Sequence, residues 1–185
     1  MHSFFISFLI FMVSTMSAFG ASLEITIKGE GANGMVVIDL FEDTAPLHVE
    51  RMLALASNGN YDGIVFHRVI EGFMAQTGDI QFGKLGGNIA KAGRGGSEMP
   101  DLAAEFSNIP FDRGIVGMAR AQNPNSANSQ FFIMFKEGYF LNGQYTVVGK
   151  VLEGMDVVDT IKLGLGSNGA VIGVPDFMEK VRPQE

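Results

Sequence analysis

Short runs of β-branched and aromatic residues recur along this chain, and glycine-containing turns separate them. Thr44 is a candidate N-cap for a helix that runs to about Ser57, and apolar side chains at helical spacing predict a second helix over 154–163. Many short strands without an internal repeat predict a mainly β protein, built as a closed antiparallel β-barrel. The predicted strands cover residues 23–28, 35–40, 64–70, 104–106, 114–119, 129–135, 145–152 and 171–181.

Composition removes several classes of function. A chain of 185 residues can form one domain with a proper core, and the absence of cysteine excludes disulfides, thiolate catalysis and thiolate metal sites. The formal net charge of -7 makes nucleic acid an unexpected partner. The glycine-rich segment 78–97 lacks the residues of a phosphate-binding loop, and the three histidines do not form a cluster in the sequence. We therefore expect no metal and no cofactor.

The first twenty residues have the composition of an export signal. They contain no Asp, Glu, Lys or Arg, and the apolar run from Phe4 to Val13 is followed by small residues near Gly20. This pattern predicts a secretory signal peptide over 1–20, cleaved before Ala21, although His2 stands where a Lys or Arg is usual. The exported domain, 21–185, is then expected in the periplasm or, alternatively, secreted.

A competing interpretation of the N-terminal segment is an uncleaved membrane anchor. The apolar stretch from Phe4 to Gly20 is 17 residues long, at the short end of a membrane-spanning length. If the segment is cleaved, no stable membrane insertion is expected.

Residues 64–70 place a cation among apolar neighbours. Period-two alternation puts Phe66, Arg68 and Ile70 on one face of the predicted strand and His67 on the other. A guanidinium in such surroundings either pairs with a buried carboxylate or serves as a fixed, always charged donor to a ligand. For His67, a hydrogen-bonded packing role is the expectation, and His48 is expected on the surface of the first helix.

Two segments together predict a pocket. After a turn at 71–72 the chain presents Phe73, Met74 and Gln76, and the strand 129–135 presents Gln130, Phe132 and Met134 on one face. The result is an aromatic and methionine-lined platform with amide groups at its edge and no nucleophile. The plain alternative is that Met74 and Phe132 are ordinary core residues.

Three collinear segments resemble signature segments of the cyclophilin-type peptidyl-prolyl cis-trans isomerases. They are Phe-His-Arg-Val-Ile-x-Gly-Phe-Met-x-Gln-x-Gly-Asp at 66–79, Gly-Ile-Val-x-Met-Ala at 114–119 and Ser-Gln-Phe-Phe-Ile at 129–133. The similarity extends from about Leu23 to Val181. It implies a barrel capped by two α-helices and an enzyme that rotates X-Pro peptide bonds in Pro-containing peptides and in folding exported proteins. The alternative is a chaperone that holds Pro-containing segments, with incidental turnover.

The resemblance also implies roles for individual residues. Arg68 is the catalytic donor, four apolar residues line the proline pocket, and two glutamines hydrogen-bond the substrate backbone. Ala119 and Arg120 line the groove. The apolar four are Phe73, Met74, Phe132 and Leu141, and the glutamines are Gln76 and Gln130.

Three groove positions depart from common family residues. Arg120 stands where eukaryotic members often have Asn, which affects one backbone contact. Phe140 and Tyr145 stand where many members have Trp and His, and both changes resemble bacterial exported members. The missing indole implies weak cyclosporin binding.

Overall fold

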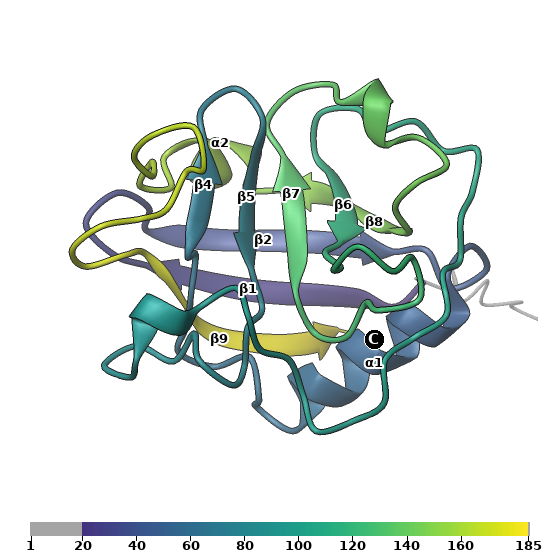
Figure 1. Ribbon diagram of the computed structural model, residues 1–185, viewed down its shortest axis with the longest axis horizontal. Coiled ribbons are helices and arrows are strands. Elements are labelled where there is room, and N and C mark those ends of the chain that lie inside the picture. The colour runs from purple at the N-terminus through teal and green to yellow at the C-terminus, as the bar shows by residue number, and fades with distance from the viewer. Residues whose placement is uncertain (1–19, 185) are drawn as a thin grey trace, which may run out of the picture.

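The computed structural model describes residues 20–184, in which strands dominate (Figure 1). The signal peptide expected at 1–20 lies, except for Gly20, outside the described residues. The two α-helices are α1 (Pro46–Ser57) and α2 (Met155–Asp159), and short 3-10 turns occupy Ile89–Lys91 and Tyr139–Leu141. The strands are β1 (Ser22–Lys28), β2 (Gly34–Leu40), β3 (Ile64–Val65), β4 (Arg68–Ile70), β5 (Met74–Thr77), β6 (Ile115–Met118), β7 (Phe131–Met134), β8 (Val147–Glu153) and β9 (Phe177–Gln184).

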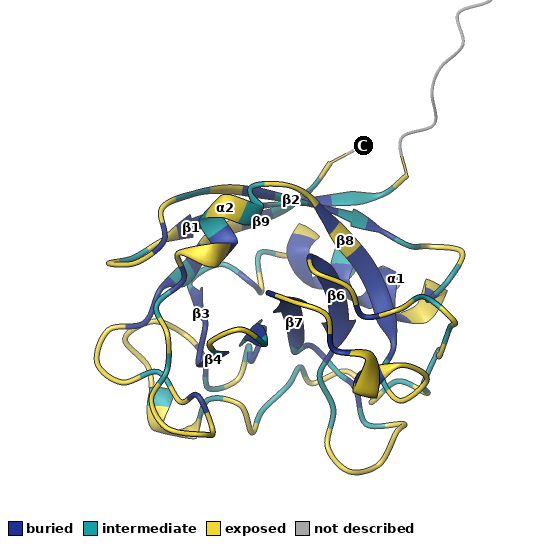
Figure 2. Ribbon diagram, turned by 90° about the horizontal axis from the view of Figure 1, so that it is seen from above, coloured by how far each residue is buried: buried dark blue, intermediate teal, exposed yellow. Residues whose placement is uncertain are grey.

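All of these strands belong to one antiparallel sheet with the order β3-β9-β1-β2-β8-β6-β7-β5-β4. The sheet curls around a largely buried interior (Figure 2). Its edges, β3 and β4, follow each other in the chain, separated only by Phe66 and His67. Residues 164–171 cover the β4 edge, where the N–H of Val69 donates to the carbonyl of Gly169 at 2.8 Å. The mainly β fold is confirmed, but the sheet is curled and open, so a closed barrel is not confirmed.

Several local predictions need correction. The predicted strand 64–70 is interrupted, so Phe66 packs in the main core with Val69 and does not share the face of Arg68 and Ile70. No strand forms over 104–106, and the last strand begins at Phe177, six residues later than expected. The strand β5 was not predicted as a strand at all.

The N-terminus of α1 is capped from another part of the chain. Thr44 is not its N-cap; that position is Ala45, which makes no side-chain capping bond. The carboxylate of Glu105 accepts hydrogen bonds from the backbone N–H groups of Leu47 and His48, at 3.1 and 3.0 Å. Its Oε2 atom also lies 2.5 Å from Nδ1 of His48, which is fully buried and not on the helix surface. A carboxylate at this end also complements the helix dipole.

Apolar side chains form one cluster on each face of the sheet. The main core lies between the curled sheet and α1 and includes Leu23, Ile38, Met52, Phe131 and Met178. A second cluster covers the other face of β5, β6 and β7, where alternation sends Phe132 and Met134 away from Phe131 and Ile133. The rest of this cluster consists of Met74, Phe111, Ile115, Leu141 and Val147. The second cluster is the floor on which the candidate site is built.

The second helix is shorter than predicted. It ends at Asp159, although Ile161 beyond it is still buried in the main core. Among residues 20–184, no helix combines the length and the apolar character needed to cross a bilayer. The same part of the chain contains no group of His, Cys, Asp and Glu side chains suited to a metal ion.

Candidate functional site

Strand pairing brings the predicted site residues together. In the ladder between β4 and β5, Arg68 is directly opposite Gln76, and in the ladder between β5 and β7, Gln76 is opposite Phe132. Met74 is paired with Met134 in the same way. The turn at 71–72 makes the first pairing possible, since Gly72 adopts a positive φ of 66°.

A pocket of about 260 Å³ opens above this part of the sheet. Phe132 forms its floor, stacked on Phe111 with ring centroids 5.8 Å apart and meeting Tyr145 edge to face at 5.9 Å. On the rim, Phe140 packs against Phe73 at 5.5 Å and is 66% exposed. The lining residues are Arg68, Phe73, Met74, Gln76, Ala119, Arg120, Phe132, Phe140, Leu141 and Tyr145. Every one of them was predicted from the sequence to be a site residue.

Arg68 lies at the edge of the pocket in a fixed orientation. Its Nε donates to the carbonyl of Asn168 at 3.0 Å, and its Nη1 donates to Oε1 of Gln76 at 3.1 Å. Partial burial lowers the pKa of Arg68, and the nearby Tyr145 opposes this effect. Among residues 20–184, no carboxylate lies within 4.0 Å of the guanidinium, so the alternative of a structural ion pair is wrong. The group is therefore a charged donor held by neutral partners.

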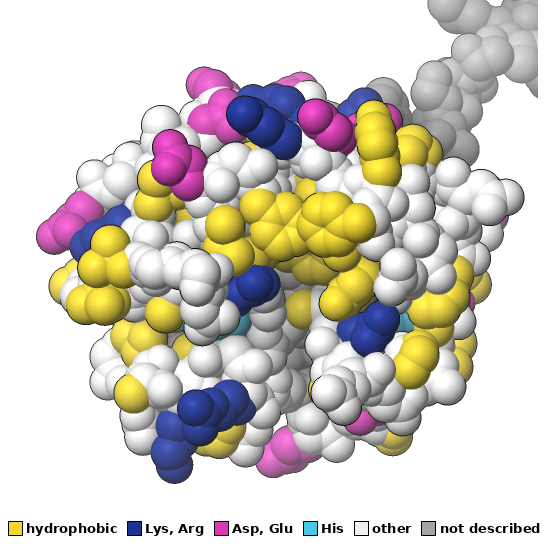
Figure 3. All heavy atoms as spheres, turned by 45° about the horizontal axis from the view of Figure 1, so that its top comes forward, with side chains coloured by type: hydrophobic (Ala, Val, Ile, Leu, Met, Phe, Trp, Pro, Cys, Tyr) yellow, Lys and Arg dark blue, Asp and Glu magenta, His cyan; other side chains and the backbone are white. Residues whose placement is uncertain are grey.

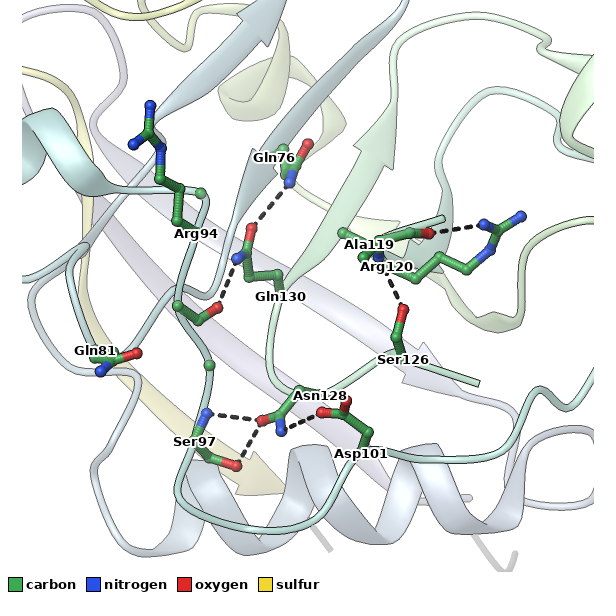
Figure 4. A pocket seen from close by; sticks show the side chains of 14 residues that line it. Gln76, Gln81, Arg94, Ser97, Asp101, Ala119, Arg120, Ser126, Asn128 and Gln130 are labelled. Atoms are coloured by element: carbon green, nitrogen blue, oxygen red, sulfur yellow. Dashed lines mark hydrogen bonds between the residues drawn. The ribbon is translucent and has the colours of Figure 1, made fainter. Parts of the chain in front are cut away.

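The two glutamines are joined side chain to side chain, as Figure 4 shows. Nε2 of Gln76 donates to Oε1 of Gln130 at 2.9 Å, and Nε2 of Gln130 donates to the carbonyl of Gly95 at 2.8 Å. Each amide thus accepts from one neighbour and donates to the next. The chain of hydrogen bonds fixes the orientation of both amides and, through Gln76, that of Arg68.

Arg120 forms one wall of the pocket through its side chain. Its guanidinium carbon lies 4.4 Å from the ring centroid of Tyr145, a cation–π arrangement. Its Nη1 and Nη2 atoms also donate to the backbone carbonyls of Ala121 and Gln144, each at 2.9 Å. An Asn side chain at this position is too short to cover the Tyr145 ring in the same way.

A second pocket, of about 440 Å³, adjoins the first and shares Gln76, Ala119 and Arg120 with it. Gln130, the remaining predicted site residue, lines this pocket. Asn128 organises its polar side, because Oδ1 accepts from the Ser97 hydroxyl and Nδ2 donates to Asp101 (Figure 4). The other lining residues are Gln81, Gly93, Arg94, Gly95, Gly96, Ala121 and Ser126.

Sequence reasoning missed the polar residues of this second pocket. They come from irregular loops, where neither helical nor strand periodicity marks which side chains point inward. A helix residue holds two of these loops in place: Arg51, almost fully buried, donates to the carbonyl of Pro100 at 2.8 Å and to that of Asn128 at 3.4 Å. An Arg within a predicted helix carries no sequence signal that it will bond to two distant loops.

The surface beside the smaller pocket is apolar, whereas polar side chains line most of the larger one. Figure 3 shows hydrophobic side chains gathered beside a hollow and Lys or Arg side chains near its edges. The ten residues that line the smaller pocket include no carboxylate, hydroxyl nucleophile on Ser or Thr, or histidine. Such a site can bind an apolar ring and donate hydrogen bonds to polar atoms of the ligand beside that ring, but its lining offers no nucleophile or carboxylate base.

His67 lies beneath the site and does not enter the pocket. Its side chain is buried, and neither ring nitrogen has a hydrogen-bond partner among residues 20–184, so the expected hydrogen bond is absent. Burial lowers the pKa of His67 to about 4, partly opposed by the charge of Asp79. The ring is therefore neutral at pH 7, and its role is to fill space beneath the site.

Comparison with known proteins agrees with this geometry. The family model described as "Cyclophilin type peptidyl-prolyl cis-trans isomerase/CLD" matches residues 22–181. A "Probable peptidyl-prolyl cis-trans isomerase" of Brucella suis is 55% identical over 178 residues, covering 95% of this chain and 90% of the relative. A peptidyl-prolyl cis-trans isomerase of Streptomyces antibioticus is 38% identical over 146 residues, covering 74% of this chain and 82% of the relative.

A solved structure shows the same fold. The cyclophilin type peptidyl-prolyl cis-trans isomerase of Cryptosporidium parvum, crystallised in the presence of the dipeptide Ala-Pro, superposes with a TM-score of 0.73. It is 26% identical in sequence, and the match covers 89% of this chain and 99% of that one.

Proposed function

Because this chain belongs to the cyclophilin-type peptidyl-prolyl cis-trans isomerases, we propose that it catalyses rotation about X-Pro peptide bonds and thereby assists protein folding. The substrate class is a Pro-containing peptide segment. The observation that carries this proposal is the position of Arg68, a permanent cation fixed at the edge of an apolar pocket of about 260 Å³.

The reaction requires no bond to a nucleophile. Rotation about an X-Pro bond passes through a twisted amide at a barrier of about 18–20 kcal/mol, and the uncatalysed change takes tens of seconds or longer. When the amide twists, its resonance is lost and the nitrogen lone pair becomes a better hydrogen-bond acceptor. A fixed donor directed at that nitrogen therefore binds the twisted state more tightly than either planar state, which is the condition for catalysis.

The described residues supply what this mechanism needs. Phe73, Met74, Phe132 and Leu141 offer apolar contact to a pyrrolidine ring, and Arg68 supplies the donor. Its hydrogen bonds to Gln76 and Asn168 orient the guanidinium before substrate arrives, so little reorganisation is needed in the twisted state. A barrier lowered by about 6 kcal/mol would accelerate rotation roughly ten-thousandfold.

The direct test is exchange between the cis and trans forms of a Pro peptide, measured by NMR with the protein in catalytic amounts. We expect fast exchange with the native protein, and slow exchange with Arg68→Ala although that variant still binds the peptide. Arg113→Ala is the matched control, since it removes an Arg that pairs with Asp159 on α2. Peptide binding without accelerated exchange in the native protein would instead support the chaperone alternative.

We also propose that the protein acts on unfolded or folding exported proteins, as an exported and periplasmic isomerase. The support is the uncharged, apolar composition of residues 1–20. Of these residues, the structure describes only Gly20. Fractionation of cells producing the full chain tests this proposal, and recovery of the intact chain from the membrane fraction would support the anchored alternative. We separately propose that cyclosporin binds this protein weakly, because Phe140 stands where many family members have Trp.

A further inference from the structure

The first described residues are attached to the segment between β2 and α1. The backbone N–H of Ala21 donates to Oε2 of Glu42 at 3.1 Å. The carbonyl of Ala21 accepts from the N–H of Leu40 at 2.9 Å. Gly20, one residue earlier, is exposed. Among residues 20–184, Ala21 is therefore the first whose backbone is bonded both through its nitrogen and through its carbonyl.

This boundary coincides with the peptide bond at which the N-terminal signal is expected to be cut. Ala21 packs against the main core, and Ser22 begins β1, opposite Asp39 on β2. Cleavage after Gly20 would leave all of these contacts in place. Cleavage one residue later would remove both hydrogen bonds of Ala21, and cleavage several residues earlier would leave extra residues ahead of Ala21.

Hydrolysis of this bond changes the chemistry of the Glu42 contact. Water adds to the Gly20 carbonyl carbon, the C–N bond breaks, and the products at pH 7 are a carboxylate on Gly20 and an α-ammonium on Ala21. A neutral amide with one N–H becomes a cation with three donors, at the same nitrogen that already faces a carboxylate.

We propose that Ala21 is the N-terminal residue of the processed protein and that Glu42 binds its α-amino group as an ion pair. This inference rests on the proposed export. The pair would hold the beginning of β1 in the sheet. Without such an attachment, the terminal residues of a domain are usually poorly ordered.

The charges around this position favour an ammonium. Asp39 of β2 has Oδ1 3.8 Å from the position of a Cβ on Gly20, and Asp43 lines the same shallow surface pocket as Glu42. Lys150 of β8 is paired with Asp39 and is the cation on the neighbouring strand. Glu24, further along β1, is hydrogen-bonded to Gln184 of β9 and is opposite Arg182, a cation that is itself paired with Asp62. Carboxylates thus outnumber cations near the new terminus, although solvent exposure limits the strength of the pair.

The experiment begins with the full chain produced in a Gram-negative bacterium. Protein recovered from the periplasm is examined by intact mass and terminal sequencing, and we expect Ala21 as its first residue. The α-amino group is then labelled by ¹³C-methylation and titrated by NMR. We expect its pKa to fall by roughly half a unit in Glu42→Gln, the size of an exposed ion pair. Asp43→Asn, an equal change of charge at the adjacent residue, should lower it less.

Two results would overturn the inference. One is a processed or intact protein that begins at a residue other than Ala21, with Met1 marking failure of the export proposal as well. The other is an α-amino pKa that is the same in the native protein and in Glu42→Gln. Isomerase activity is measured on the same samples and is expected to be equal in all three, because Glu42 and Asp43 lie outside both groove pockets. An inactive protein that begins at Ala21 and shows the pKa shift would refute the isomerase function while supporting this inference.

Discussion

Nη1 of Arg68 and Oε1 of Gln76 are 3.1 Å apart, and the two residues are directly opposite each other on β4 and β5. The side-chain bond therefore repeats the backbone pairing. Because Gln76 is itself held by Gln130, which directly precedes β7, the position of the guanidinium depends on both β5 and the start of β7.

Replacing Gln76 tests whether the position of Arg68 matters for the rate. We expect Gln76→Ala to slow cis–trans exchange about tenfold, because loss of one hydrogen bond of about 1–1.5 kcal/mol leaves the guanidinium held by the Asn168 carbonyl and a weak contact with the sulfur of Met74. Gln81→Ala is the control, since Gln81 lines only the larger pocket. Exchange by NMR is the measurement, and equal rates for the two variants would contradict the prediction.

Replacing Arg68 by Lys separates charge from geometry. Lysine keeps the positive charge but loses the planar fork that addresses two acceptors at once. We expect Arg68→Lys to lose about 2–4 kcal/mol of barrier stabilisation, nearly as much as Arg68→Ala, with peptide binding retained through the apolar pocket. Arg113→Lys controls for the substitution itself. A lysine variant with most of the native exchange rate would show that charge alone is sufficient.

Replacing Phe140 tests the rim of the pocket. An indole supplies an N–H donor that phenylalanine lacks, so we expect Phe140→Trp to bind cyclosporin roughly fivefold more tightly, equivalent to about 1 kcal/mol for one hydrogen bond. Tyr139→Trp is the matched control, because Tyr139 is exposed next to the pocket without lining it. Calorimetric titration gives both affinities. Tight, nanomolar binding by the native protein would show that the rim does not decide affinity.

Burial of His67 predicts acid destabilisation. Its pKa is lowered to about 4 in the folded protein, whereas the unfolded chain binds the proton near the ordinary value of 6.5. Between these values the unfolded state carries more protons, so stability falls as pH drops from about 6.5 to about 4, by up to about 3 kcal/mol. Urea unfolding at pH 7 and pH 4.5 measures the loss. His67→Gln should show a smaller loss over this interval, and an unchanged pH dependence in that variant would exclude His67 as the cause.

The local pattern of the chain was sufficient for much of the fold, whereas the site residues were chosen by resemblance to a known family. Alternation in 129–135 correctly separated Phe132 and Met134 from Phe131 and Ile133, because successive strand residues must point to opposite faces. The family resemblance, which extends from about Leu23 to Val181, named as site residues the ten residues that surround the smaller pocket. Their proposed roles in binding and catalysis stay predictions until they are measured.

Other features depended on contacts between distant segments, which no local pattern records. Thr44 has the chemistry of an N-cap, but Glu105, 57 residues beyond His48, supplies the capping carboxylate. The strand predicted through Phe66 and His67 is interrupted, because β3 pairs with β9 while β4 pairs with β5. Whether Arg68 was an ion-pair partner or a free donor was open in the sequence. Tertiary structure decided it by placing a Gln side chain and a backbone carbonyl, and no carboxylate from residues 20–184, beside the guanidinium.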